Sequence, residues 1–286
     1  MAPHGDILFI IKSQYGSFTK AEKKVAGLIL NDPAAVMYMS ITDLADACQV
    51  GETSVFRFCR DLGLKGYQSF KILLAQSVNK DAAAQLPQSR AIEDEDDAAA
   101  IVEKLAALHT EALRETSLLN PPSAFVQAVD WMINASKIHF FGAGSSFITA
   151  LEGYNRFLKI EPKVSVSMDT HMQTMAAALM QPGDAAVIVS YSGSTRDMAD
   201  IAQLLQRRGV KVICMTRFAK SPVSAAADLV LLCGAQEGPL QSGGVAARIS
   251  QLYLIDILYH EYFHRDPARF QHNNELTADA AAAKLY

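Results

Sequence analysis

The sequence contains little cysteine and no cysteine pair of the kind that binds zinc or forms redox sites. Only four of its 286 residues are cysteines, and no two of them stand in a C-x-x-C arrangement. Each lies in an apolar or helical pattern, which is typical of a buried thiol rather than of a disulfide framework. The four are Cys48, Cys59, Cys214 and Cys233. We therefore expect reduced thiols and a cytoplasmic protein.

Long apolar segments are also missing. Charged residues, glycine or proline interrupt every candidate run before it reaches the roughly 18 residues that a membrane-spanning helix needs. The first six residues lack the basic region and cleavage site of a secretory signal. We expect no membrane partner.

An excess of positive charge is absent as well. Lys and Arg number 26 against 30 Asp and Glu, a net charge of -4. This excludes a uniformly basic nucleic-acid-binding chain. The charge is uneven, however: residues 1–80 carry 9 basic and 7 acidic residues, whereas residues 81–115 carry 3 and 9. Any DNA binding must therefore be local to the N-terminal segment.

The length and the 50% apolar content suggest about two domains. The acidic run Glu93–Asp97 has the composition of a solvated connector or an exposed helix start. We predict a helical domain over residues 1–79 and a connector with a linking helix over 80–119. A second domain over 120–265 and a C-terminal tail over 266–286 follow.

The N-terminal segment has the signals of several short helices. Thr19–Glu22 reads as a capping box, and Ser40–Asp43 is a second helix start. The tight turn Gln49–Gly51 leads into a helix over Glu52–Leu62, which ends at the glycine cap Gly63. This order predicts an all-α helix-turn-helix domain.

The second of these helices has two faces. The apolar face comprises Val55, Phe58, Cys59 and Leu62, and it can pack on Leu44, Ala45 and Cys48. The outward residues suit a DNA major groove: Thr53, Ser54, Phe56, Arg57 and Arg60, with Lys65 in reach of a phosphate. An ordinary surface helix with two arginines is the alternative. Glu52 is unfavourable near phosphates, although it could help to cap the helix.

Beyond the connector, strands and helices alternate. The five β-branched or apolar runs cover residues 137–141, 163–167, 185–190, 211–216 and 228–232. Helical stretches between them predict a five-stranded parallel α/β sheet covered on both faces. Ligands of such a sheet bind at the carboxyl ends of its strands.

Two of these strand ends lead into loops rich in glycine and hydroxyl groups. We name Gly142–Ser146 the first hydroxyl loop and Ser190–Thr195 the second. Glycine permits a close backbone approach and the following helix supplies free N–H donors, which together suit a phosphate. A dinucleotide fingerprint fails because Phe147 replaces its third glycine, and neither loop has a Walker lysine. Simple strand-to-helix turns are the remaining alternative, and we expect no cofactor.

The motifs together resemble a known two-domain family. Ser190–Thr195, Gly209–Thr216, Ser221–Val223 and Ala227-Asp228 resemble the sugar isomerase (SIS) domain. Val55–Gly63 with Gly66-Tyr67 looks like the helix-turn-helix of RpiR-type (MurR/RpiR) transcriptional regulators. The resemblance covers nearly the whole chain. The sequence departs from the family at Gly51, where a capping serine is usual, and glycine is a tolerable cap.

The resemblance implies a flavodoxin-like SIS domain that senses a phosphorylated sugar, and a bacterial regulator rather than an enzyme. Carried over by position, the ligand residues are Gly144, Ser145, Ser146, Ser190, Ser192, Gly193, Ser194 and Thr195, with His171 near the sugar. The histidine could equally be a solvent-facing or capping residue. A homodimer or homotetramer would bind double-stranded operator DNA at an inverted repeat.

Two enzymatic alternatives remain. SIS domains also occur in aldose/ketose phosphate isomerases, which need a carboxylate base; Glu152 and Glu237 lie in suitable regions, but neither stands in a recognisable motif. His260, Glu261 and His264 satisfy the H-E-x-x-H pattern of zinc peptidases, with Glu275 or His272 as a third ligand. Because these residues end a helix patterned for core packing, we predict no metal site.

Overall fold

The computed structural model describes residues 6–81, 92, 95–235 and 244–284. They form two compact units, one drawn from residues 1–110 and 236–244 and the other from residues 111–235 and 245–286. Each unit has a hydrophobic core of its own.

The N-terminal unit is a helical bundle, as predicted. Its elements are α1 (Ile7–Gln14), the 3₁₀ turn η1 (Tyr15–Ser17), α2 (Lys20–Asn31), α3 (Pro33–Met37), α4 (Ile41–Cys48), α5 (Glu52–Asp61) and α6 (Tyr67–Asp81). The predicted capping box of Thr19 with Glu22 forms before α2, and the predicted helix start at Ser40 is also a capping box, in which Ser40 pairs with Asp43 before α4. These local bonds satisfy helix N–H groups that would otherwise lack partners.

The second unit is built on the predicted five-stranded parallel sheet. Its strands are β1 (Ile138–Gly142), β2 (Val164–Val166), β3 (Ala185–Val189), β4 (Lys211–Thr216) and β5 (Leu229–Leu232). They lie in the order β2-β1-β3-β4-β5. This is the flavodoxin-like order, and its strand order reverses between β1 and β3.

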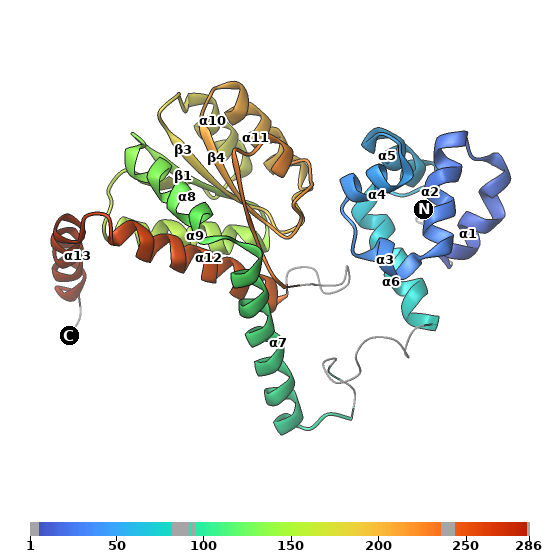
Figure 1. Cartoon of the computed structure of the whole chain (residues 1–286), viewed down its shortest axis with the longest axis horizontal. Coiled ribbons are helices and arrows are strands. Elements are labelled where there is room, and N and C mark those ends of the chain that lie inside the picture. Colours follow the sequence, from blue (N-terminus) through green and yellow to red (C-terminus); the bar gives the residue numbers. More distant parts are fainter. Residues whose placement is uncertain (1–5, 82–91, 93–94, 236–243, 285–286) are drawn as a thin grey trace. The chain divides into compact units, whose positions relative to one another are not determined.

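Helices cover both faces of this sheet (Figure 1). One face carries α8 (Pro122–Asn134), α9 (Ser145–Leu158) and α12 (Val245–Phe263), and the other carries α10 (Thr170–Leu179), α11 (Arg196–Arg207) and the 3₁₀ turn η2 (Ser224–Ala226). Side chains alternate along each strand, so Phe140 enters the first core and Phe141 the second. Two buried layers explain why the strands read as continuous apolar runs.

The helix α7 (Ala98–Leu119) is tied to the edge strand β5 at its C-terminal end. The Asn120 side chain donates to the Leu232 carbonyl at 2.8 Å and accepts from the Leu232 N–H at 2.7 Å. The Thr116 hydroxyl accepts from the Gly234 N–H at 2.9 Å. Polar side chains thus complete the hydrogen bonding of this sheet edge.

The C-terminal residues, predicted only as a tail, include a docked helix, α13 (Pro267–Ala282). Its Phe270 is buried in the core, and its Arg269 donates to the Glu161 carboxylate at 2.8 Å. Glu161 is itself buried and accepts a second hydrogen bond from the Tyr262 hydroxyl at 2.8 Å. A buried carboxylate needs such partners, so this cluster attaches α13 to the domain.

All four cysteines are buried free thiols, as expected. Burial raises the pKa of Cys59 to about 12 and also raises the pKa of Cys214 well above its ordinary value. Thiolate chemistry is therefore disfavoured at both. Across the described ranges, no helix combines the length and the apolar character needed to cross a membrane.

One titratable side chain lies inside the second core. His139 of β1 is 6% exposed and packs against Phe141 with ring centroids 4.3 Å apart. Its Nδ1 lies 2.8 Å from the Ser165 hydroxyl, and its Nε2 has no partner among the described residues. Burial lowers the pKa of His139 to about 4 because the charged imidazolium is poorly solvated there.

We therefore predict that the second unit loses stability in mild acid. His139 is neutral in the fold and protonates more readily once unfolded, so its contribution to stability is complete above pH 6.5 and is lost as the pH falls from 6.5 to about 4. The expected loss is about 3 kcal/mol between pH 7 and pH 4. Urea unfolding across this range should show a smaller acid dependence for His139→Gln than for the wild type. The control His272→Gln removes an exposed histidine and should keep the wild-type slope.

Candidate functional sites

The outward face of α5 is the first candidate site. Val55, Phe58 and Cys59 are buried against α4, as predicted. The opposite face exposes Thr53, Phe56, Arg57 and Arg60, with Ser54 half-buried and Lys65 exposed just beyond the helix. Positions 53, 56, 57 and 60 lie on one side of a helix, which is the geometry that a major-groove reader requires.

The turn between α4 and α5 is set by local geometry. Gln49 adopts the left-handed conformation with φ of 52°, and Gly51 caps α5 without a side-chain bond. Glu52 turns back toward α4, where its carboxylate accepts a hydrogen bond from the Thr42 hydroxyl. The carboxylate of this half-buried residue is thus hydrogen-bonded to α4.

The two hydroxyl loops leave neighbouring strands at the second candidate site. β1 and β3 pair in register from Ile138↔Ala185 to Gly142↔Val189, so both loops start at the same height on the sheet. This point is the switch in strand order, the usual ligand crevice of open α/β sheets. Both loops therefore begin at the same edge of the sheet.

The first loop is held by two buried glutamines. Gln173 of α10 accepts from the Gly142 N–H at 3.1 Å and donates to the Gly142 carbonyl at 2.9 Å. Gln251 of α12 donates to the Ser146 hydroxyl at 3.2 Å. The Ser146 oxygen also accepts from the Tyr191 N–H at 3.4 Å, which links the two loops directly.

The second loop has a backbone that requires glycine at position 193. Gly193 has φ of 61°, and a Cβ built there would lie 2.1 Å from the Ser221 hydroxyl oxygen. Its carbonyl accepts from the Val223 N–H at 3.0 Å, and the Tyr191 carbonyl accepts from the Thr216 hydroxyl at 3.1 Å. The loop is therefore fixed against the segment that joins β4 to β5.

Ser190 lies at the base of this site. Its residue is 3% exposed, and its hydroxyl oxygen has no hydrogen-bond partner among the described residues. Buried hydroxyl groups are almost always paired, because an unpaired one costs about 1–3 kcal/mol. An unsatisfied hydroxyl at a ligand crevice is a strong pointer to binding.

The remaining predicted ligand residues lie in the two hydroxyl loops and at the start of α10. Gly144 and Thr195 precede α9 and α11, and neither makes a side-chain capping bond, which leaves helix N–H donors available. Ser145 and Ser194 are exposed, and Ser192 is half-buried. His171 is exposed near the start of α10, and its backbone N–H donates to the Asp169 carboxylate at 2.9 Å.

Sequence reasoning missed the framework of the site. Gln173, Gln251, Thr216 and Ser221 position the loops but lie 20 or more residues from the loop that each supports. For Gln251 the one available signal was a polar residue within an apolar helix. That signal does not say what the amide contacts.

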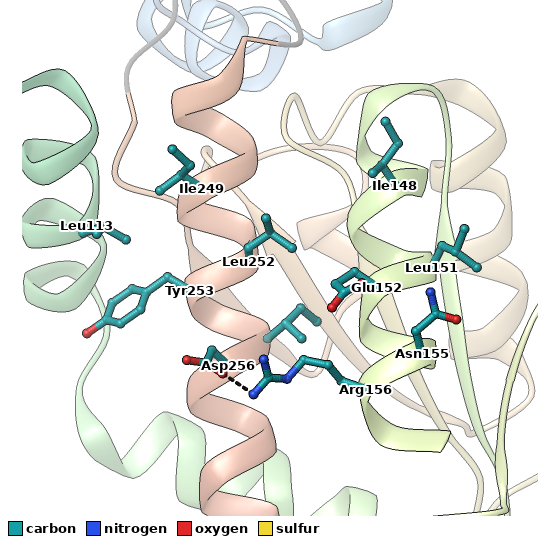
Figure 2. A pocket seen from close by; sticks show the side chains of 11 residues that line it. Leu113, Ile148, Leu151, Glu152, Asn155, Arg156, Ile249, Leu252, Tyr253 and Asp256 are labelled. Atoms are coloured by element: carbon teal, nitrogen blue, oxygen red, sulfur yellow. Dashed lines mark ion pairs between the residues drawn. The ribbon is translucent and has the colours of Figure 1, made fainter. Parts of the chain in front are cut away.

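A separate groove of about 610 Å³ lies between α7, α9 and α12 (Figure 2). Mostly aliphatic side chains line it, with an ion pair of 2.6 Å between Arg156 and Asp256. Glu152, a candidate isomerase base, is one of its lining residues, while Glu237 lies outside the described residues. Glu152 thus belongs to this groove and not to the hydroxyl loops.

The H-E-x-x-H residues lie at the end of α12. His260 and His264 are exposed; His260 lies 3.6 Å from Asp256, and Glu261 pairs with Arg265 at 3.1 Å. Over the ranges that the structure describes, no three metal-ligating side chains cluster into a site. Two of the three polar side chains of the motif, those of His260 and Glu261, thus lie beside charged partners on the surface.

Two known families match separate parts of the chain. Residues 5–81 match the helix-turn-helix domain of the rpiR family, and residues 132–261 match the SIS domain.

Similar proteins extend over most of the chain. HexR of Pseudomonas aeruginosa, an HTH-type transcriptional regulator, is 36% identical over 253 residues, covering 88% of this chain and 87% of HexR. HexR of Escherichia coli is 31% identical over 94% of this chain and 92% of its own. The solved structure of Vibrio vulnificus NanR complexed with ManNAc-6P has a TM-score of 0.84 and 28% identity, covering 97% and 98%.

Proposed function

This chain belongs to the RpiR family of helix-turn-helix transcriptional regulators that carry a SIS domain, and we propose that a phosphorylated sugar bound at its two hydroxyl loops controls its affinity for operator DNA. The exposed face of α5 would read the DNA. The sugar phosphate would act as a signal for sugar metabolism.

The single observation that carries the ligand proposal is the buried hydroxyl of Ser190, which has no hydrogen-bond partner in the part of the chain that the structure describes. A phosphate oxygen could accept its hydrogen bond together with those from the free N–H groups that begin α9 and α11. Neither hydroxyl loop contains a charged residue, so these neutral donors and helix dipoles would balance the phosphate charge. NanR, whose structure contains ManNAc-6P, supports the same ligand class.

We propose binding without turnover at this site. Isomerisation needs a carboxylate that moves a proton between neighbouring carbons. The hydroxyl loops contain no carboxylate, and Glu152 lines the separate groove. The related proteins of similar length are named as regulators.

A dimer or tetramer is the assembly that this function requires. Two copies of α5 would enter successive major grooves about 34 Å apart on an inverted repeat. Each N-terminal unit has only a small positive charge, so a single copy would bind DNA weakly. Two copies double the contacts that Arg57, Arg60 and Lys65 make with DNA.

A route from the ligand to the linking helix lies within the second unit. The Tyr191 hydroxyl in the second loop donates to the Ala235 carbonyl at 2.6 Å. The adjacent Gly234 N–H donates to Thr116 of α7 at 2.9 Å, with no space for a side chain between them. A sugar phosphate that shifts Tyr191 would thereby bias α7, provided that it binds the two states with different affinity.

DNA binding should depend on the arginines of α5. We predict that Arg57→Ala or Arg60→Ala weakens binding about tenfold or more, because each removes a charged hydrogen-bond donor. Anisotropy titration would use an operator fragment that the wild type selects from a random-sequence pool. Lys12→Ala, which removes an exposed charge on α1, is the control and should bind like the wild type. Unchanged affinity in the arginine variants would refute the assignment of α5.

Ser190→Ala should weaken the binding of sugar phosphates without lowering the free energy of unfolding. We expect the free variant to be as stable as the wild type or more so, because an unpaired buried hydroxyl is removed. Its affinity for sugar phosphates should fall about tenfold or more. Calorimetric titration with ManNAc-6P and a panel of hexose and pentose phosphates, alongside urea unfolding, measures both.

The matched control is Ser250→Ala, a buried serine whose hydroxyl already donates to the Ala246 carbonyl. It should keep the wild-type affinity. If Ser190→Ala also retains wild-type affinity, the ligand lies elsewhere. Product analysis that reveals isomerised sugar would support the enzyme instead.

Tyr191→Phe should reduce the effect of sugar phosphate binding on DNA affinity. The variant keeps the ring but loses the hydrogen bond to Ala235, so sugar phosphate should still bind while its effect on DNA affinity shrinks by up to about fivefold. The measurement is the ratio of DNA dissociation constants with and without the sugar phosphate. Tyr154→Phe is the control and should keep the wild-type ratio. A full response in Tyr191→Phe would exclude this route.

A further inference from the structure

The outward face of α5 contains one residue that does not fit its polar surroundings. Phe56 is 46% exposed, whereas Phe58, two positions along the same helix, is completely buried. Phe56 shares its face with Thr53 one turn before it and Arg60 one turn after it. An apolar ring is therefore presented on the surface assigned to DNA.

The ring is held in place by the backbone that follows α5. A Cβ built on Gly66 would lie 3.2 Å from Cε2 of Phe56, so the ring rests directly over this glycine. Gly66 opens α6, since its carbonyl accepts from the Phe70 N–H at 3.1 Å. The absence of a side chain at position 66 lets the ring lie against the loop beside Lys65.

The chemistry of a phenyl ring restricts what it can recognise. It has no conventional hydrogen-bond donor or acceptor, so it adds nothing to phosphate binding. Among the base edges of the major groove, the apolar group is the C5-methyl of thymine, and phenylalanine is one of the side chains that contact it.

We infer that Phe56 recognises thymine methyl groups, so that each operator half-site contains a thymine opposite this ring. The inference rests on the proposed DNA-binding function and adds a sequence preference to it. Arg57 and Arg60 would contact phosphates or guanine edges, and Phe56 would supply the apolar part of the readout.

The test compares DNA with and without the methyl group. An operator fragment selected by the wild type from a random-sequence pool is amplified with either thymidine or deoxyuridine triphosphate. Burial of one methyl group corresponds to about a fourfold change in affinity. The wild type should therefore bind uracil DNA about fourfold more weakly for each methyl contacted, and Phe56→Ala should bind the two fragments equally.

Two further variants sharpen the comparison. Phe9→Ala removes an exposed ring on α1, 70% accessible, and should retain the wild-type preference for thymine. Phe56→Leu keeps an apolar side chain and should retain part of it. Because Phe56 is partly exposed, circular dichroism should show that both Phe56 variants fold like the wild type.

The outcomes separate this inference from the function on which it rests. Equal wild-type affinity for thymine and uracil DNA would overturn the inference and leave DNA binding intact. A thymine preference that survives in Phe56→Ala would overturn it as well, because another group would then contact the methyl. Failure of the wild type to select any DNA would overturn the proposed function together with the inference.

Discussion

The pairing of β1 with β3 is the constraint on which the candidate ligand site depends. These strands are separated along the chain by α9, β2 and α10, yet their register sets Gly142 beside Val189. The two hydroxyl loops consequently begin at one edge of the sheet, each followed by a helix whose N-terminal donors lack side-chain caps. A parallel sheet with this strand order creates the crevice, and the loop residues give it its chemistry.

The crevice contains a network of hydrogen bonds beneath the loops and one buried hydroxyl group without a hydrogen-bond partner among the described residues. Gln173 and Gln251 are buried, and the amide group of Gln173 and the amide N–H of Gln251 form hydrogen bonds with the first loop. Gly193 lets the second loop lie against Ser221. Within this well-bonded frame the Ser190 hydroxyl stands without a partner among the described residues. Preorganised donors of this kind bind an anion without the cost of ordering the loop on association.

In the helix-turn-helix, too, some side chains pack within the domain and others are exposed on the surface that would contact DNA. Glu52 is bonded to Thr42 within the domain, and Val55 and Phe58 are buried, so the outward face is left to Thr53, Phe56, Arg57 and Arg60. An acidic chain can therefore present a locally basic surface. The net charge of -4 describes the whole molecule and says little about the part that would meet DNA.

Local pattern determined much of this structure. Features that depend on neighbours within a few residues could be predicted directly from the sequence. They are the helix starts at Thr19 and Ser40, the glycine that follows α5, the two faces of α5, and all five strands. Tertiary structure alone decided which groups Gln251 and Glu161 contact and how α13 packs on the domain. It also decided that Glu52 bonds to α4 and that the Phe56 ring lies against Gly66. Finally, it left the Ser190 hydroxyl without a partner among the described residues. The bonds of Gln251 and Glu161 join residues about a hundred positions apart, and no local periodicity records which distant group a buried polar atom will meet or fail to meet.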